Sequence, residues 1–86
     1  NFSLKQNYPN PFNPTTILRF QIKDSRFVSM KVYNMLGKEV VTLVNDKLNA
    51  GEYEVTFDGS NLSSGIYFYK LEAGDFSEVK KMILVK

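Results

Sequence analysis

The sequence predicts an all-β protein built as a sandwich of antiparallel sheets. Six or seven short runs rich in β-branched and aromatic residues follow one another at spacings of about 8–12 residues, and Gly, Pro, Asn, Asp or Ser separates them. Apolar residues alternate along several runs with the period of two that places successive side chains on opposite faces of a strand. No segment shows the 3.6-residue period of an amphipathic helix. Regularly spaced strands without helices are typical of a β-sandwich.

The most aromatic run, residues 64–71, predicts a central strand. Both of its faces are largely apolar, which favours a strand with neighbours on each side. We place Tyr67, Tyr69 and Leu71 on the inward face, since burial of large apolar side chains dominates the stability of a small domain. Tyr67 follows a turn, as does the tyrosine corner of an immunoglobulin-like sandwich, whose hydroxyl bonds to upstream backbone. The predicted fold is therefore an immunoglobulin-like antiparallel β-sandwich of about seven strands.

Composition narrows the range of functions. The chain has 86 residues, enough for one small domain, and it contains no cysteine and no histidine. Disulfides, thiolate chemistry, His-based acid–base catalysis and the common zinc sites are thereby excluded. The net charge of +2, with both signs interspersed, does not indicate binding to nucleic acid.

The chain opens with a short apolar stretch and a proline-containing loop. Residues 2–4 predict a short edge strand, and residues 7–14 hold all three prolines. Each proline fixes its own φ and pushes the preceding residue toward extended geometry, so we expect a stiff loop whose Asn side chains satisfy nearby backbone groups. Tyr8 and Phe12 are predicted to anchor it. The loop is either a stiff connection or a recognition element, because rigid loops lose little entropy on binding.

Five further strands complete the predicted sheets. They span residues 15–22, 27–33, 38–44, 52–58 and 76–86. Alternation in the first, second and fourth of these strands places nine residues inward: Leu18, Phe20, Ile22, Val28, Met30, Val32, Tyr53, Val55 and Phe57.

Two of these strands, and one polar segment, do not follow simple alternation. Residues 40–44 are apolar without a period of two, which either a bulge or burial on both faces explains. Residues 45–51 are polar and are predicted to form a loop. In the last strand both faces are apolar, and we place Met82 and Leu84 inward.

No constellation of residues predicts catalysis, a metal site or a cofactor. Hydroxyl groups are numerous, but no histidine is present to activate one. Glu52 and Glu54 lie on one face of a strand, where a solvated surface is the simplest interpretation. The turn at residues 58–61 carries one carboxylate, whereas a calcium cage needs several oxygen ligands. A carbohydrate-binding face of Tyr33, Ile66 and Phe68 stays open, because the sequence alone does not place these residues together.

Several motifs resemble one family of secretion signals. The match covers nearly the whole chain in order, through residues 8–16, 32–40, 50–51, 57–59, 62–69 and 80–82. Tyr8-Pro-Asn-Pro-Phe-Asn-Pro-Thr-Thr16 and the terminal Lys80-Lys81-Met82 are similar to the C-terminal sorting domains of type IX secretion in Bacteroidetes. The middle of the chain also resembles Ig-like domains of flagellar hook-capping proteins. The departures are Ile17-Leu18, which adds an apolar residue, and Lys23, where such domains often carry proline.

The resemblance implies a targeting module and not an enzyme. Its expected partners are an outer-membrane translocon with a membrane-embedded shuttle protein, a sortase-like peptidase that removes the domain, and a covalently linked upstream cargo. It places the recognition residues near the two ends of the chain: Tyr8, Pro9, Asn10, Pro11, Phe12, Asn13, Pro14, Lys80, Lys81, Met82, Ile83, Leu84, Val85 and Lys86. The last strand could add to a partner's sheet edge, and its lysines either steer docking or protect that edge from aggregation.

Two other functions stay open at this point. One is an Ig-like accessory or carbohydrate-binding module of a secreted hydrolase, and the other is a structural filament or hook-cap domain. Because the chain begins with Asn1, we expect residues 1–86 to be a single sorting domain excised from a larger secreted protein that passes through the periplasm to the cell surface.

Overall fold

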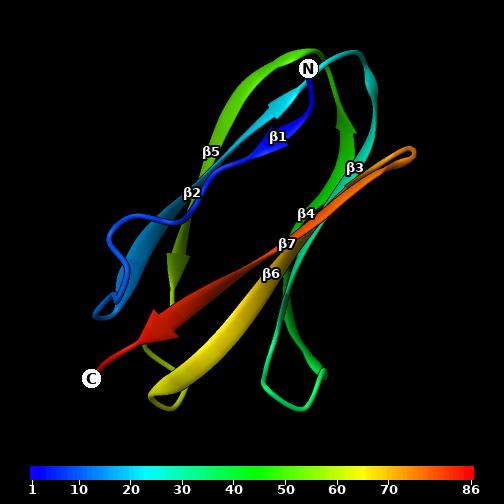
Figure 1. Cartoon of the computed structure of the whole chain (residues 1–86). Helices are drawn as coiled ribbons and strands as arrows, with labels where there is room; N and C mark the ends of the chain where they lie inside the picture. Colours follow the sequence, from blue (N-terminus) through cyan, green and yellow to red (C-terminus); the bar gives the residue numbers. More distant parts are fainter.

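The computed structural model describes residues 1–86 and consists of two antiparallel sheets that face each other (Figure 1). β1 (Ser3–Leu4), β2 (Thr15–Ile22) and β5 (Gly51–Asp58) form a three-stranded sheet in the order β1-β2-β5. β4 (Glu39–Leu48), β3 (Arg26–Tyr33), β6 (Gly65–Ala73) and β7 (Phe76–Leu84) form a four-stranded sheet in that order. These seven strands confirm the predicted immunoglobulin-like sandwich, and the two termini lie toward opposite ends of it (Figure 1). No helix is long and apolar enough to cross a membrane.

The core lies between the two sheets and is built from the inward faces of their strands. All predicted inward residues of β2, β3, β6 and β7 are buried: Leu18, Phe20, Ile22, Val28, Met30, Val32, Tyr67, Tyr69, Leu71, Met82 and Leu84. β6 lies between β3 and β7, as expected for a central strand. The Tyr67 hydroxyl donates a 2.8 Å hydrogen bond to the carbonyl of Ser63, four residues upstream, which is the geometry of a tyrosine corner.

β5 is less buried than its alternation predicts. Phe57 is buried, but Tyr53 and Val55 are only half-buried and pack against the margin of the core. β5 is an edge strand with β2 on one side only, so Tyr53 and Val55 keep contact with solvent on the unpaired side. Tyr53 stacks on Phe20 with 5.5 Å between ring centroids, and its hydroxyl donates to the carbonyl of Asn49.

β4 differs most from the prediction. The strand continues to Leu48, so the loop predicted for residues 45–51 is wrong except at its final turn. Backbone pairing needs no apolar side chain, and β4 is an edge strand, so its polar second half pairs with the start of β3 while its side chains stay in water. Two register shifts leave Val40 and Leu43 without partners on β3. Bulges therefore explain why the apolar residues of this strand do not alternate.

Candidate recognition surface

The two segments predicted for recognition lie side by side in the fold. We name them the Asn-Pro loop (residues 7–14) and the terminal segment (residues 80–86). The Phe12 N–H donates to the Ile83 carbonyl at 2.9 Å, and the Val85 N–H donates to the Phe12 carbonyl at 2.9 Å. Asn10, 73 residues from Ile83 in sequence, accepts the Ile83 N–H through its side-chain oxygen at 2.9 Å. The loop thus acts as a short parallel partner along the outer edge of β7.

Apolar packing beneath these bonds fixes the loop to the core. Phe12 is 2% exposed and meets the Phe57 ring edge-on at 5.9 Å between centroids. Gly59 lies against both Phe12 and Leu84, and a Cβ at this position would come within 3.0 Å of the Leu84 Cδ2 atom. The Gly59 N–H also donates to the Pro14 carbonyl at 2.8 Å. The absence of a side chain at Gly59 therefore permits the close approach of loop, turn and terminal strand.

Tyr8 does not anchor the loop, contrary to the prediction. Its side chain is 72% exposed, whereas that of the preceding residue, Asn7, is buried. Tyr8 exchanges backbone hydrogen bonds of 3.0 and 2.9 Å with Ile17, which gives this stretch the alternation of a strand. Because neighbouring side chains then point to opposite sides, Asn7 takes the inward position and Tyr8 faces solvent.

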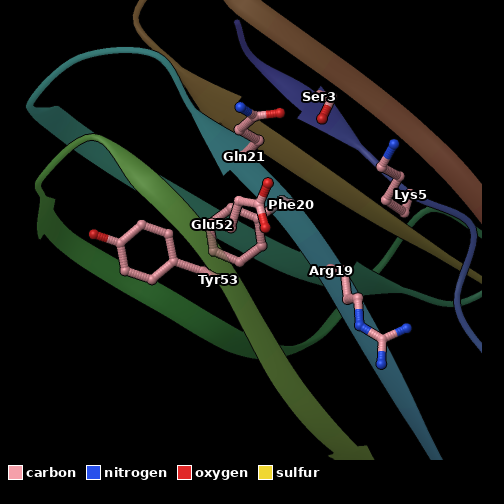
Figure 2. A pocket seen from close by; sticks show the side chains of 7 residues that line it. All are labelled: Ser3, Lys5, Arg19, Phe20, Gln21, Glu52 and Tyr53. Carbon is pink, nitrogen blue, oxygen red and sulfur yellow. The ribbon is translucent and has the colours of Figure 1, made fainter.

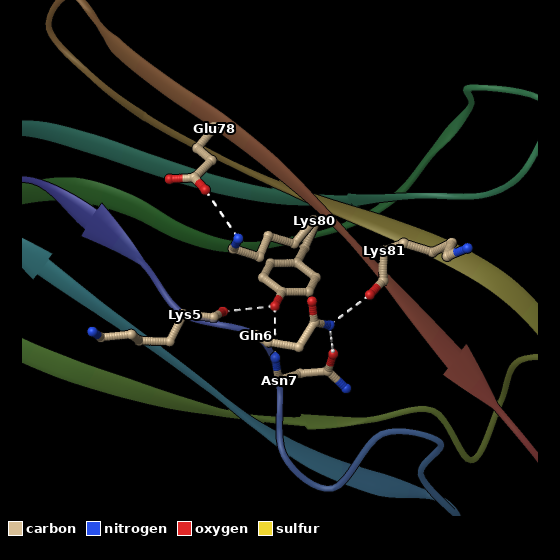
Figure 3. A network of polar contacts seen from close by, with 7 residues as sticks. Lys5, Gln6, Asn7, Glu78, Lys80 and Lys81 are labelled. Carbon is tan, nitrogen blue, oxygen red and sulfur yellow. Dashed lines mark hydrogen bonds and ion pairs between the residues drawn. The ribbon is translucent and has the colours of Figure 1, made fainter.

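Asn7 is the polar centre of the loop. It confirms the predicted bonding of Asn side chains to nearby backbone, but its burial and its central role were not predicted. Its amide nitrogen donates to the Pro9 carbonyl at 3.1 Å and to the Thr16 hydroxyl oxygen at 3.0 Å, and Thr16 in turn donates to Pro9 at 2.8 Å. The Gln6 amide donates to the Asn7 side-chain oxygen and to the Lys81 carbonyl, each at 2.7 Å (Figure 3). Asn7 stands two residues before a proline, and this spacing was the one available signal, since Asn often bonds backbone two residues on.

Tyr69 connects this network to the four-stranded sheet. Its hydroxyl accepts the Asn7 N–H and donates to the Lys5 carbonyl, both at 2.7 Å. Burial raises the pKa of Tyr69 to about 12, because the phenolate would be taken out of water. Tyr69 is therefore both a core side chain and the hydrogen-bonding partner of the chain segment that leads into the Asn-Pro loop.

The raised pKa of Tyr69 predicts a loss of stability at alkaline pH. An unfolded tyrosine titrates near pH 10, whereas folded Tyr69 keeps its proton to about pH 12. Its contribution to the free energy of unfolding is fully present below pH 10 and is lost as pH rises toward 12, by about 2–3 kcal/mol. Urea titrations from pH 8 to 12 should show the stability difference between wild type and Tyr69→Phe narrowing by this amount. A difference that stays constant would contradict the raised pKa of Tyr69, because all other titratable groups are common to both proteins.

The predicted recognition residues divide by exposure. Three are buried and hold the arrangement together: Phe12, Met82 and Leu84. Three are half-buried: Pro14, Lys80 and Ile83. Eight are exposed, and we call them the recognition surface: Tyr8, Pro9, Asn10, Pro11, Asn13, Lys81, Val85 and Lys86. A partner that meets the folded domain can contact only the exposed and half-buried groups.

The charges of the terminal segment have different environments. The Lys80 ammonium lies 3.0 Å from the Glu78 carboxylate, while Lys81 and Lys86 take part in no ion pair. The Lys86 N–H donates to the Ser64 hydroxyl and its ammonium donates to the Ser60 carbonyl, which ties residue 86 to the loop before β6. Lys81 therefore carries an unpaired positive charge on β7, the strand that pairs with the Asn-Pro loop.

Two other surface features are weaker candidates for a site. A hollow of about 110 Å³ over the three-stranded sheet is lined by Ser3, Lys5, Arg19, Phe20, Gln21, Glu52 and Tyr53, whose side chains are drawn in Figure 2. The charged ends of Lys5 and Arg19 diverge there, so the hollow does not gather its groups around one point. On the outer face of the other sheet, Tyr33 and Phe68 are cross-strand partners. Both are half-buried together with Ile66, which makes them a weaker platform than exposed aromatic rings.

Comparison with known proteins places the chain in a family. The protein is an Ig-like sandwich. Its Asn-Pro loop and its terminal segment, which carry the two end motifs, lie side by side and form one surface. The family of secretion system C-terminal sorting domains matches residues 6–86, and the chain belongs to it. This is the type IX secretion family that the motifs resemble, so the chain is a sorting domain of that system.

A solved structure shows the same fold in another protein. The crystal structure of dimeric latent PorU from Porphyromonas gingivalis is similar over 95% of this chain, with 19% sequence identity and a TM-score of 0.74. The similar region is 9% of the PorU chain. The Ig1 domain of mouse SynCAM 2 is similar over 84% of this chain and 81% of its own, with 18% identity and a TM-score of 0.45. No curated protein matches the sequence.

Proposed function

We propose that this domain directs a cargo joined to its N-terminal side through the type IX translocon, and that the recognition surface is the part that the translocon reads. The observation that carries the proposal is the junction between the Asn-Pro loop and the terminal segment. Backbone and side-chain hydrogen bonds join the Asn-Pro loop to the terminal segment, so the two motifs typical of the family form one continuous surface.

The rigidity of this surface suits recognition in a folded state. Three prolines, the buried Phe12 ring and the hydrogen bonds of Asn7 already hold the loop in place. A partner therefore has little conformational entropy to remove when it binds. The ammonium group of Lys81 and the exposed side chain of Lys86 add positive charge that steers an acidic partner surface toward the junction.

The structure favours docking of the formed surface over strand addition along the terminal segment. Gln6, Asn10 and Phe12 already bond the outward-facing backbone groups of the terminal segment from Lys81 to Val85. A partner strand would have to displace the loop before it could pair there. We therefore expect the shuttle protein of the translocon to contact side chains of the folded domain.

The place of the chain termini fits a signal carried at the end of a cargo. The first residue lies at the end of the sandwich away from the Asn-Pro loop and the last residue (Figure 1). A polypeptide joined there leaves the recognition surface open. The proposal includes passage of the cargo through the periplasm and removal of the domain by a sortase-like peptidase, and it gives the domain no catalytic role of its own.

Charge reversal on the recognition surface tests the proposal. We expect a reporter fused ahead of residues 1–86 to reach the surface of a host with type IX secretion, and Lys81→Glu/Lys86→Glu to reduce surface reporter by about tenfold or more. The matched control is Lys23→Glu/Lys47→Glu, which changes the charge equally at exposed positions away from the junction. Surface display is measured by protease shaving and antibody labelling, and the melting temperature shows that both variants fold.

The outcomes separate clearly. Wild-type reporter that stays in the periplasm would refute the signal function. Equal export of both charge variants would show that the translocon does not read the recognition surface through its positive charge. Deleting residues 80–86 is not a clean test, because Met82 and Leu84 are buried in the core and their loss would unfold the sandwich.

A further inference from the structure

The turn between β3 and β4 presents two large apolar side chains to solvent. Leu36 is 92% exposed and Met35 is 68% exposed, and neither belongs to the hydrophobic core or packs against it. The other tight turns carry small or polar residues at their tips, at residues 23–25, 49–50 and 74–75. Single exposed apolar residues are ordinary, but two adjacent ones at the tip of a hairpin form a convex apolar knob.

The fold does not need these two side chains to make the turn. The Asn34 side-chain oxygen accepts the Leu36 N–H at 2.9 Å and the Lys38 N–H at 3.0 Å. The Gly37 N–H donates to the Asn34 carbonyl at 3.0 Å, and the Asn34 N–H donates to the Lys38 carbonyl at 2.9 Å. Gly37 supplies the positive φ of 83°. Asn34 and Gly37 therefore determine the turn, and small polar residues could occupy positions 35 and 36.

We infer that Met35 and Leu36 form a docking knob that inserts into an apolar socket on a protein partner. Four hydrogen bonds fix the turn before binding, so a partner gains the buried area of two side chains without ordering the loop. A large apolar anchor that fills a pocket is the usual form of a binding hot spot. The knob lies toward the same end of the sandwich as the last residue, so one partner could contact both (Figure 1).

The charges around the knob favour a protein socket over a lipid surface. Lys38 and Glu39 flank the tip, and Glu39 is paired with Lys31 at 3.6 Å, so these three groups carry a net charge of +1. Tips that insert into membranes carry several basic residues around the apolar part, which attract anionic lipid. A polar rim with one excess positive charge around an apolar centre is a better match for a pocket in a protein.

The test compares a double serine variant of the knob with a single serine variant elsewhere, in binding to the type IX translocon purified into nanodiscs. This choice of partner rests on the proposed function. Met35→Ser/Leu36→Ser should weaken binding of the 86-residue chain about tenfold to a hundredfold, from the apolar burial that is lost. Phe27→Ser is the matched control, since Phe27 is exposed at the opposite end of β3 and should leave binding unchanged. Neither variant should shift the melting temperature by more than a few degrees.

Each result decides a different question. Wild-type chain that does not bind the translocon counts against the proposed function as well as the knob. If the wild-type chain binds and Met35→Ser/Leu36→Ser binds equally well, the docking role of the knob is refuted and the proposed function is not. A third measurement, flotation with protein-free vesicles of phosphatidylethanolamine and phosphatidylglycerol, should show no binding. Knob-dependent flotation would overturn the protein socket, because lipid would then be what receives Met35 and Leu36.

Discussion

Phe12→Ala is expected to lower the free energy of unfolding by about 3–5 kcal/mol, the usual cost of deleting a buried phenylalanine side chain. A domain of this size has a total stability of about 4–13 kcal/mol, so the loss is a large fraction of it. Phe12 is buried between Phe57, Gly59 and Leu84, so its truncation would leave a cavity in the core. Urea unfolding followed by circular dichroism measures the effect.

Tyr8→Ala provides the matched control for Phe12, since both residues are aromatic and belong to the same loop. Tyr8 is exposed, so its truncation should change the free energy of unfolding by no more than about 0.5 kcal/mol. Amide hydrogen exchange adds a local measurement: the Val85 N–H, which donates to Phe12, should lose protection in Phe12→Ala and keep it in Tyr8→Ala. Equal effects of the two substitutions would mean that Phe12 does not hold the loop.

Tyr69→Phe should be the second most damaging substitution, although it removes a single oxygen atom. The Asn7 N–H and the Lys5 carbonyl would both lose their partner at a buried site. Leaving a buried polar group unpaired costs about 1–3 kcal/mol for each group. The free energy of unfolding at pH 7, from urea denaturation, should therefore fall by about 2–4 kcal/mol.

Three tyrosines of this chain form a graded series for that measurement. The Tyr69 hydroxyl makes two hydrogen bonds to backbone, the Tyr67 hydroxyl makes one to Ser63, and the Tyr33 hydroxyl makes none. Tyr67→Phe should cost about 1 kcal/mol, and Tyr33→Phe should be close to neutral. If Tyr33→Phe and Tyr69→Phe are equally destabilising, the hydroxyl of Tyr69 is not what holds the Asn-Pro loop to the sheet.

Sequence periodicity predicted the strands with one well-buried face and failed where burial is partial. β2 and β3 alternate because each packs one face on the opposite sheet, and that packing selects an apolar residue at every second position. The second half of β4 carries no such signal, because its pairing with β3 is made by backbone groups alone. Tyr53 and Val55 have the right period, yet the sequence gives no sign that β5 lies at a sheet edge.

The candidate site was predicted as two motifs but not as one surface. The Asn-Pro loop and the terminal segment stand out locally, by their prolines, lysines and apolar residues. Their contact depends on which strands become neighbours, and local patterns do not contain that information. The role of Gly59 follows from the same long-range contact, and the buried hydrogen bond of the Asn7 N–H depends on Tyr69, 62 residues away, so the sequence offered only weak signs of both.

The pairing of Phe12 with residues 83 and 85 has a consequence for biosynthesis. A segment made early finds its hydrogen-bonding partners among residues made more than 70 positions later, as Asn10 and Ile83 show. During translation the Asn-Pro loop lacks its hydrogen-bonding partners until β7 and the residues after it leave the ribosome. A product that stops before residue 82 would expose both the unpaired loop and the apolar core that Met82 and Leu84 otherwise complete. A receptor that reads the closed junction would thereby distinguish finished chains from truncated ones.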